Sequence, residues 1–179
     1  MDYLKALYYI AHVDKQDNII DKVERWKAHE KGILHRAFTL SIMFEDTLVL
    51  QHRKHPVFDG IYDVSISSHP FYINESLQDP LDAIYRTLAR EWHIEKHQLI
   101  RQPEYKGKIY YQASDPHSKY QEHEICYIYT CELKEIIMPS FETAYGFSLQ
   151  TVKQLKNPQN PLYPLLAPWV KKMIEENLL

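Results

Sequence analysis

The stretch Asp79–Ile94 reads DPLDAIYRTLAREWHI and carries the clearest secondary-structure pattern in the chain. Its apolar residues recur at spacings of three and four, the period of an amphipathic helix, so we expect a helix over Leu81–Trp92. Asp79 suits the N-cap, and Pro80 suits the first helical turn, where its missing N–H costs nothing. The spacing predicts that the core-facing residues are Leu81, Ile84, Leu88 and Trp92.

Segments on both sides of this helix have the patterns of β-strands. Before it, we expect strands at Leu7–Val13, Ile19–Val23, Ala37–Phe44, Thr47–Gln51 and Tyr62–Ser67, with loops over His52–Gly60 and His69–Pro80. After it, we expect strands at Lys108–Ala113 and Glu124–Glu132, and helices at Phe147–Lys156 and Pro168–Glu176. Strands that flank a helix, followed by further helices, are typical of an α/β/α sandwich, here in a single domain.

Length, charge and cysteine content exclude several classes of protein. The chain has 179 residues and a net charge of −3, without a basic block, which argues against binding to nucleic acid. Its longest apolar runs are too short to span a bilayer, and the N-terminus lacks the pattern of a signal peptide. Cys126 and Cys131 do not form a CxxC pair, so we expect neither a disulfide framework nor a thiolate zinc site. We therefore expect a cytoplasmic protein without a membrane or nucleic-acid partner, as a monomer or a weak dimer.

Histidines and a pair of carboxylates form a candidate metal site. Glu122 and Glu124 are two residues apart in an expected strand, so both side chains point to one face. Two like carboxylates repel each other unless a cation or a proton lies between them. Together with His29, His35 and His69, this donor set suits Mn²⁺ or Zn²⁺ better than Ca²⁺. By spacing alone the five residues define no motif, and scattered histidines that bind no metal are the commoner case.

Three other groups of residues have both an ordinary and a functional interpretation. Arg86 and Arg90 lie on one face of this helix, and Glu91 lies beside them. Either this face is an ordinary solvated surface, or the Glu91 carboxylate holds Mg²⁺ against a diphosphate. The basic segment 52–55, with Arg25 and Lys27 upstream, is equally a polar loop or a phosphate clamp. The Ser67-Ser68-His69 run lacks a G-x-S-x-G elbow and an assignable third member, which argues against acyl transfer.

The order of these pieces resembles that of the metal-dependent isopentenyl-diphosphate isomerases of type 1, a family with the Nudix fold. The strings that carry the resemblance are KAHEKGILHRAF (27–38), SISSHP (65–70), RTLAREWHI (86–94), IYYQASDP (109–116) and EHEIC (122–126). They are similar to the family's L-H-x-A-F, C-x-H-P, R-x-x-x-x-E-L-G-I, Y-x-A and E-x-E-x-C patterns, and the resemblance extends from about Val13 to Trp169. It implies a Nudix-type α/β/α sandwich with a mixed sheet, additional N-terminal strands and C-terminal helices.

The resemblance also implies roles for single residues. It implies that the ligands of the Mn²⁺ or Zn²⁺ site are His29, His35, His69, Glu122 and Glu124. It also implies that Glu91 and the substrate diphosphate bind the same Mg²⁺ ion. It puts Arg25, Arg53, Lys54 and Arg86 near that diphosphate, and it makes Ser67, Glu124 and Tyr111 the catalytic residues. The implied partner is a small allylic or homoallylic diphosphate. The implied reaction interconverts isopentenyl and dimethylallyl diphosphate by protonation of a double bond, through a tertiary carbocation, and loss of a proton elsewhere.

The chain departs from the family at two important positions. Ser67 stands where the family has its catalytic cysteine, and a hydroxyl is a far weaker acid than a thiol, whose ordinary pKa is about 8.5. The family's C-terminal tryptophan has no clear counterpart: Tyr163 or Pro164 lies there, and we align Trp169 with a different residue. The departures leave three possibilities open: a slow isomerase, a catalytically degenerate protein that binds isoprenoid diphosphates, and an enzyme for another diphosphate.

Hydrolysis of a diphosphate by a nucleotide-type Nudix enzyme requires a fuller set of helix carboxylates. In this chain Thr87 and Arg90 replace two glutamates of the Nudix box, and His93 replaces its glycine. Only Arg86 and Glu91 remain, so the sequence favours the isomerase over the hydrolase.

Overall fold

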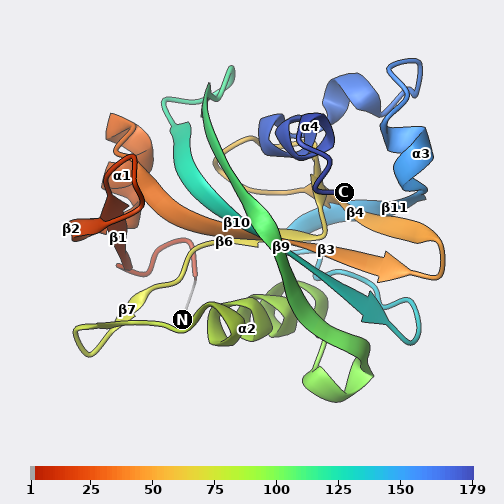
Figure 1. The fold of residues 1–179 in the computed structure, drawn as a ribbon, viewed down its shortest axis with the longest axis horizontal. Coiled ribbons are helices and arrows are strands. Elements are labelled where there is room, and N and C mark those ends of the chain that lie inside the picture. Colours follow the sequence, from red (N-terminus) through yellow and green to blue (C-terminus); the bar gives the residue numbers. More distant parts are fainter. Residues whose placement is uncertain (1–2) are drawn as a thin grey trace.

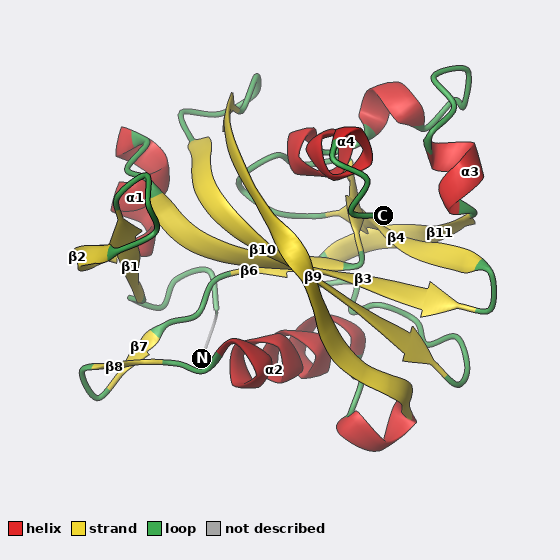
Figure 2. Cartoon of the chain, viewed as in Figure 1, coloured by secondary structure: helices red, strands yellow, loops and turns green. Residues whose placement is uncertain are grey.

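A mixed β-sheet separates two helical layers in the computed structural model of this protein, which describes residues 3–179. Helix α2 covers one face of the sheet, and helices α3 and α4 lie over the other (Figure 1). Helix α1 and strands β1 and β2 form one end of the molecule, next to the start of β3 (Figure 2). This arrangement confirms the predicted α/β sandwich with a mixed sheet, additional N-terminal strands and C-terminal helices.

The elements follow one another along the chain with short connections. In order they are β1 Tyr9–Val13, β2 Ile19–Glu24, α1 Arg25–Lys31, β3 His35–Phe44, β4 Thr47–Arg53, β5 Tyr62–Val64, β6 Ile66–Ser68, β7 Tyr72–Ile73, β8 Ser76–Leu77, α2 Pro80–Trp92, β9 Leu99–Ser114, β10 Gln121–Leu133, β11 Ala144–Gln150, α3 Val152–Leu155 and α4 Pro168–Glu175. Short 3₁₀ turns lie at Lys96–Gln98 and Tyr163–Leu165.

Strand β3 is the centre of the sheet and sets the positions of the residues discussed below. It pairs in parallel with β10, which puts Glu124 beside His35, and antiparallel with β6, which puts Ser67 beside Thr39. Strand β10 also pairs antiparallel with β9, so that Tyr111 lies beside Glu124. Side chains of laterally paired residues point to the same face of a sheet, so residues distant in sequence meet on one side.

Helix α2 begins and ends as its sequence predicts. The Asp79 carboxylate accepts a hydrogen bond from the backbone N–H of Leu81 at 2.8 Å, and Pro80 occupies the first turn. Ile84, Leu88 and Trp92 are fully buried against the sheet. The prediction was wrong for Leu81, which lies in the first turn and is 39% exposed.

Other expectations need correction. The predicted helix Phe147–Lys156 is wrong over its first half, because residues 147–150 belong to β11 and pair with β4 at the sheet edge. Only Val152–Leu155 is helical, with Thr151 as its N-cap in a capping box with Gln154. Helix α1 and the small β7–β8 hairpin were not predicted, and β9 and β10 are both longer than expected.

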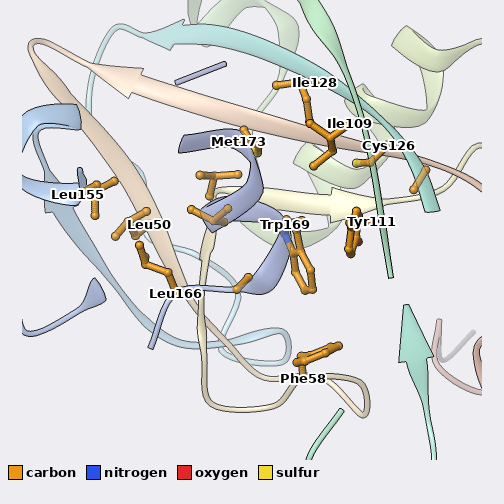
Figure 3. Close-up of a cluster of buried hydrophobic side chains, with 14 of the residues drawn as sticks. Leu50, Phe58, Ile109, Tyr111, Cys126, Ile128, Leu155, Leu166, Trp169 and Met173 are labelled. Carbon is orange, nitrogen blue, oxygen red and sulfur yellow. The ribbon is translucent and has the colours of Figure 1, made fainter. Parts of the chain in front are cut away.

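Two apolar layers fill the space between the sheet and its helices. On the α4 side, Trp169 and Met173 pack against residues of β9 and β10 that include Ile109 and Ile128 (Figure 3). On the α2 side, the helix residues pack against Phe38, Leu40 and Ile42 of β3, among others. Because Trp169 is the first large residue of α4, packing of this helix brings its indole next to Tyr111 (Figure 3). No helix in the described part of the chain is long and apolar enough to cross a membrane.

Replacing Leu88 by alanine should destabilise the protein by about 2–5 kcal/mol, because it leaves a cavity between α2 and the sheet. The matched control is Leu81→Ala on the same helix, which should cost much less, since Leu81 is already 39% exposed. The measurement is the free energy of unfolding from urea denaturation. Equal losses for the two variants would contradict the packing described for α2.

Candidate metal and diphosphate site

Five buried side chains from four elements gather at one end of strands β3 and β10. Strand β10 supplies Glu122 and Glu124, the start of β3 supplies His35, α1 supplies His29, and His69 directly follows β6. Each of these residues is at most 8% exposed. Within the triplet His29, His35 and His69, and within the triplet His35, Glu122 and Glu124, the possible ligand atoms all lie within 4.8 Å of one another. The structure therefore brings together the five residues that the sequence predicts as metal ligands.

Direct contacts link the imidazoles to the two carboxylates. Nδ1 of His29 lies 3.3 Å from Oε2 of Glu122. Nε2 of His35 lies 3.3 Å from Oε1 of Glu124, and Nε2 of His69 lies 3.1 Å from the same oxygen. Glu124 is thus shared between two rings.

The hydrogen bonds of His35 leave a lone pair directed at the cluster. Its Nδ1 lies 2.7 Å from the carbonyl oxygen of Ile33, which can only accept, so Nδ1 carries the proton. In a neutral ring Nε2 is then an acceptor, and it faces a carboxylate oxygen, another acceptor. Among the described residues, Nε2 of His35, Nδ1 of His69 and Oε2 of Glu122 are buried without a hydrogen-bond partner. Buried acceptors that face each other require a cation or an added proton, and imidazole with carboxylate is a donor set that fits a borderline divalent metal.

Burial and neighbouring charges also shift the pKa values of the cluster. Burial opposes charge on His29, but the nearby carboxylate of Glu122 outweighs it and raises the pKa of His29. For His69, burial and the neighbouring histidines act in the same direction and hold its pKa well below the usual range. Burial would raise the pKa of Glu124, but the hydrogen bond and charge of His35 outweigh it, so that pKa is lowered. The cluster thus favours an ionised Glu124 beside a neutral His69, as metal ligation requires. The raised pKa of His29 means that a metal ion would have to displace a proton from this ring.

Tyr111 is joined to the cluster through Glu124. Its hydroxyl donates a hydrogen bond to Oε2 of Glu124 at 2.5 Å. Burial, followed by the charge of Glu124, raises the pKa of Tyr111 well above its ordinary value. Tyr111 therefore stays a neutral phenol and can hand its proton only to this carboxylate or to a bound molecule.

Ser67 lies on the other side of β3, on the same face of the sheet. Its Oγ is 2.9 Å from Oγ1 of Thr39, which is in turn 3.3 Å from the Sγ of Cys126. Burial raises the pKa of the Cys126 thiol well above its usual range, and this thiol is within the apolar layer under α4.

A pocket connects these groups. Of the predicted site residues it brings together Arg25, His29, Arg53, Ser67, His69, Tyr111, Glu122 and Glu124. His35 is fully buried behind them. Glu91 and Lys54 border an adjoining cavity that also contacts Arg53 and Ser67. Arg86 lines neither cavity, because its guanidinium donates to Gln78 and lies over the ring of Phe71.

The two buried arginines of the pocket differ in how many of their N–H groups are engaged. Arg53 donates to the Val57 carbonyl and to Asp63, and its third nitrogen lies 3.0 Å from Nδ1 of His55. Arg25 is 2% exposed and donates only to the carbonyl of Tyr3 at 3.0 Å, while its Nε and Nη1 have no partner among the described residues. A buried guanidinium with unpaired donors is a fitting site for an anion.

Glu91 and Lys54 have partners of their own in this structure. Glu91 is 2.6 Å from Nη2 of Arg90 and 3.3 Å from the amide of Gln51. Lys54 donates from Nζ to the carbonyl of Phe141 at 3.0 Å. Arg90 also lies over the ring of Tyr3, at 3.6 Å from its centroid, so it does not belong to a simple solvated face.

Two residues of this region, Trp169 and Asp63, were not predicted from the sequence to belong to the site. Trp169 borders the pocket with its ring centroid 5.9 Å from that of Tyr111, although we aligned it with a residue other than the family's C-terminal tryptophan. Asp63 is fully buried and bonded to Trp169. An aspartate inside a strand pattern was a signal of its special role, since this residue type is depleted in strands.

Comparisons with known proteins find one relative by sequence and solved structures that share the fold. No protein-family model matches the chain. Isopentenyl-diphosphate delta-isomerase 2 of Homo sapiens is 31% identical to it over 131 residues, which cover 65% of this chain and 57% of the human protein. The chain therefore spans little more than half the length of the curated relative it matches.

Solved structures of low sequence identity share the fold. DR0079 from Deinococcus radiodurans superimposes with a TM-score of 0.70 at 12% identity, covering 94% of this chain and 98% of that one. A MutT NUDIX hydrolase from Burkholderia pseudomallei does so with a TM-score of 0.57 at 13% identity, covering 79% of this chain and 96% of that one. The chain has a Nudix-like fold.

Mn²⁺ or Zn²⁺ should raise the melting temperature of the protein, because an ion that binds only the folded cluster stabilises the folded state by mass action. At a free metal concentration of one hundred times the Kd, this stabilisation is about 2.7 kcal/mol. Glu122→Gln should abolish most of this shift, since it removes one of the two negative ligands of the cluster. The exposed Glu135→Gln is the control and should melt like the unmodified chain. Thermal melts with and without metal measure the effect, and equal shifts for both variants would rule out this metal site.

Proposed function

We propose that this chain is a metal-dependent isomerase that interconverts isopentenyl diphosphate and dimethylallyl diphosphate. The observation that carries the proposal is the pairing of Tyr111 with Glu124, across one buried pocket from Ser67, beside the His/Glu cluster. The allylic proton shift requires an acid and a base at separate points of a carbon skeleton in a dry pocket. The human relative supports this reaction in preference to others that use the same fold.

The metal would be held by His29, His35, His69, Glu122 and Glu124, whose donor set suits Mn²⁺ or Zn²⁺. When bound, a divalent cation supplies positive charge that neutralises the two carboxylates and lowers the pKa of nearby acids. The protein itself keeps the rings oriented: the carbonyl of Ile33 fixes the tautomer of His35, and burial keeps His69 neutral.

The proton donor of the proposed reaction is the Tyr111–Glu124 pair. Tyr111 donates a hydrogen bond to Glu124 at 2.5 Å, and in the proposed reaction a proton taken up by this pair is delivered to the terminal methylene carbon of the substrate. Ser67 accepts the proton that leaves the neighbouring methylene carbon, which moves the double bond. The hydroxyl is a poorer proton carrier than a thiol, so we expect the chain to be slow.

Aromatic side chains are suited to stabilise the cation that forms between these two proton transfers. Trp169 and Tyr111 both border the pocket, with ring centroids 5.9 Å apart. The negative face of an indole attracts a cation more strongly than the other aromatic rings do. Phe58 packs edge-on against Trp169, with centroids 5.6 Å apart, and keeps water from its other side.

The diphosphate would lie near Arg25, the guanidinium with unpaired donors, and near Glu91 with a Mg²⁺ ion. Arg25 is held between the rings of Tyr3 and Trp26, at 4.4 and 4.3 Å from their centroids, which aims its free N–H groups without a carboxylate partner. Lys54 and Arg86 would require release from their present partners to contribute. We infer that the protein acts in the cytoplasm, in keeping with two buried, free cysteines.

A diphosphate hydrolase is the second candidate, because solved structures with this fold include a MutT NUDIX hydrolase. In such a hydrolase the catalytic carboxylates would lie on helix α2, which has few carboxylates at those positions. Thr87 is buried with its hydroxyl bonded to the Ala83 carbonyl, and Arg90 is paired with Glu91. The third candidate, a protein that binds isoprenoid diphosphates without turnover, is favoured by Ser67 alone.

Incubation with isopentenyl diphosphate in D₂O, with Mg²⁺ and Mn²⁺, should yield dimethylallyl diphosphate that carries deuterium. Ser67→Cys should be faster by about one to three orders of magnitude, since each 1.36 kcal/mol off the barrier gives tenfold in rate. Product and deuterium content are measured by NMR and mass spectrometry. Release of inorganic phosphate without isomer would support the hydrolase, and binding without any product from either form would support the binding protein.

Arg25→Gln should weaken binding of the substrate diphosphate by about tenfold or more, because it removes a charge-assisted donor pair from a buried site. The exposed Arg101→Gln serves as the control, since Arg101 is remote from both cavities. Calorimetric titration with inorganic pyrophosphate in the presence of Mg²⁺ measures the affinity. If Arg25→Gln binds pyrophosphate as the unmodified chain does, the diphosphate lies elsewhere.

A further inference from the structure

Residues 3–8 form a segment of turns that precedes strand β1 and runs from α1 toward α2 (Figure 1). Two side chains of α1 attach it to the rest of the molecule. Nη2 of Arg25 donates to the carbonyl of Tyr3 at 3.0 Å, and Nε1 of Trp26 donates to the carbonyl of Leu4, also at 3.0 Å. The segment thus lies against the candidate site without being a strand of the sheet.

Tyr3 borders both cavities of the candidate site. It lines the pocket that contains Arg25 and Glu124, and it also lines the adjoining cavity that contains Glu91. Each of these spaces has a free volume of about 30 Å³. That is room for about one or two water molecules, whereas sites for small molecules commonly have about 300 Å³ or more. A substrate diphosphate therefore enters only if a neighbouring group moves.

The ring of Tyr3 is held by the charges of two arginines. The guanidinium carbon of Arg25 lies 4.4 Å from the ring centroid, and that of Arg90 lies 3.6 Å from it. An aromatic face attracts a cation but accepts no strong hydrogen bond from it. Nε and Nη1 of Arg25 and Nε of Arg90 are buried without a partner among the described residues. The ring therefore covers two positive charges while it leaves these donors unused.

A diphosphate offers the acceptors that the Tyr3 ring lacks. Its oxygens are charged, and hydrogen bonds between guanidinium and phosphate are stronger than those of guanidinium with neutral groups. Both guanidinium carbons lie within 4.4 Å of the same ring centre, so one diphosphate in the place of the ring would reach both arginines. Trp26, whose ring centroid is 4.3 Å from the Arg25 guanidinium, would still support that side chain.

We propose that Arg25 and Arg90 form the subsite for the diphosphate of the substrate, and that Tyr3 occupies this subsite until a diphosphate displaces it. The proposal rests on the function proposed above, and it adds Arg90 to the residues that bind the substrate. A neutral molecule does not displace the ring, because it brings no negative charge to the guanidiniums. The reaction pocket therefore stays closed until a molecule with the matching anionic group binds.

The ordinary alternative is that Tyr3 is only a packing residue. Its ring centroid lies 5.7 Å from that of Tyr8 and 6.2 Å from that of Phe71, so it also contributes to a small aromatic cluster. In that role its replacement changes the stability of the protein and leaves its affinity for anions as it is. The two roles are separated by substitutions that keep either the bulk or the aromatic face of Tyr3.

Calorimetric titration with inorganic pyrophosphate in the presence of Mg²⁺ tests the subsite. Tyr3→Leu keeps apolar bulk but has no aromatic face, so it should bind pyrophosphate about tenfold more tightly, because a competing occupant is lost. Tyr3→Phe keeps the aromatic face and should show no such gain. Adding Arg90→Gln to Tyr3→Leu should weaken binding again by about tenfold, since a charged donor is removed.

The control is Tyr105→Leu, which removes a 49% exposed tyrosine that borders neither cavity. It should bind pyrophosphate as the unmodified chain does. Equal affinities of Tyr3→Leu and the unmodified chain would overturn the proposal. So would a gain in Tyr3→Leu that persists after Arg90→Gln, because Arg90 would then not belong to the subsite.

Cleavage by trypsin reports the displacement of the segment in the unmodified chain. Lys5 lies in the segment, and the exposed Lys15 lies in the turn between β1 and β2. Saturating pyrophosphate should speed cleavage after Lys5 by about tenfold, because cleavage follows the population of the open form, and leave cleavage after Lys15 unchanged. Slower or unchanged cleavage after Lys5 would mean that the diphosphate binds with Tyr3 in place, and would overturn the proposal.

Failure of the isomerase function gives a different pattern from failure of the subsite. If the chain converts isopentenyl diphosphate but Tyr3→Leu shows no gain in affinity, the isomerase stands and the subsite is wrong. If Tyr3→Leu binds pyrophosphate more tightly while no variant forms isomer, the subsite stands and the isomerase is wrong. If neither the unmodified chain nor Tyr3→Leu binds pyrophosphate, the subsite is wrong whatever the reaction.

Discussion

Two carboxylates on the same face of one buried strand are the constraint on which the rest of this site depends. Glu122 and Glu124 repel each other in a medium where charge is poorly screened, so they require positive charge close by. The mixed topology supplies ligands for a cation that would provide this charge, since the parallel pairing of β3 with β10 puts His35 directly beside Glu124. Helix α1 and the turn after β6 bring two further imidazoles to the same place. A purely antiparallel arrangement of these strands would put the beginning of β3 at the opposite end of β10.

The features that local sequence controls were predictable, and those that depend on distant pairing were not. Helix α2 could be located because its period, its Asp79 cap and its proline act within a few residues. The segment 147–150 was assigned wrongly because its conformation is decided by hydrogen bonds to β4, about one hundred residues earlier in the chain. Alternation in the sequence correctly put Glu122 and Glu124 on one face. That three histidines would meet them followed from the family resemblance, because no local pattern encodes the register of β10 on β3.

Trp169 and Asp63 show the same limit at the level of single side chains. Their hydrogen bond joins residues 106 positions apart, and it forms only when α4 packs on the sheet. From sequence, Trp169 was one more apolar residue of an amphipathic helix. Its place in the pocket depends on which part of α4 packs beside Tyr111 (Figure 3). Asp63 looked like a polar residue of an alternating strand. Its burial makes it exceptional, since an ionised carboxylate is rarely enclosed without a partner.

The contact of Asp63 with Arg53 divides the basic residues of the pocket into two kinds. Arg53 donates its N–H groups to Asp63, Val57 and His55. Its charge therefore helps to keep the buried carboxylate of Asp63 ionised near neutral pH. Arg25 keeps two donors unpaired and is the one left to bind an external anion. An unpaired Arg53 would be a second place in this pocket for an anion to bind. An anion that enters the pocket is therefore directed to Arg25 by the pairing of Arg53 with Asp63.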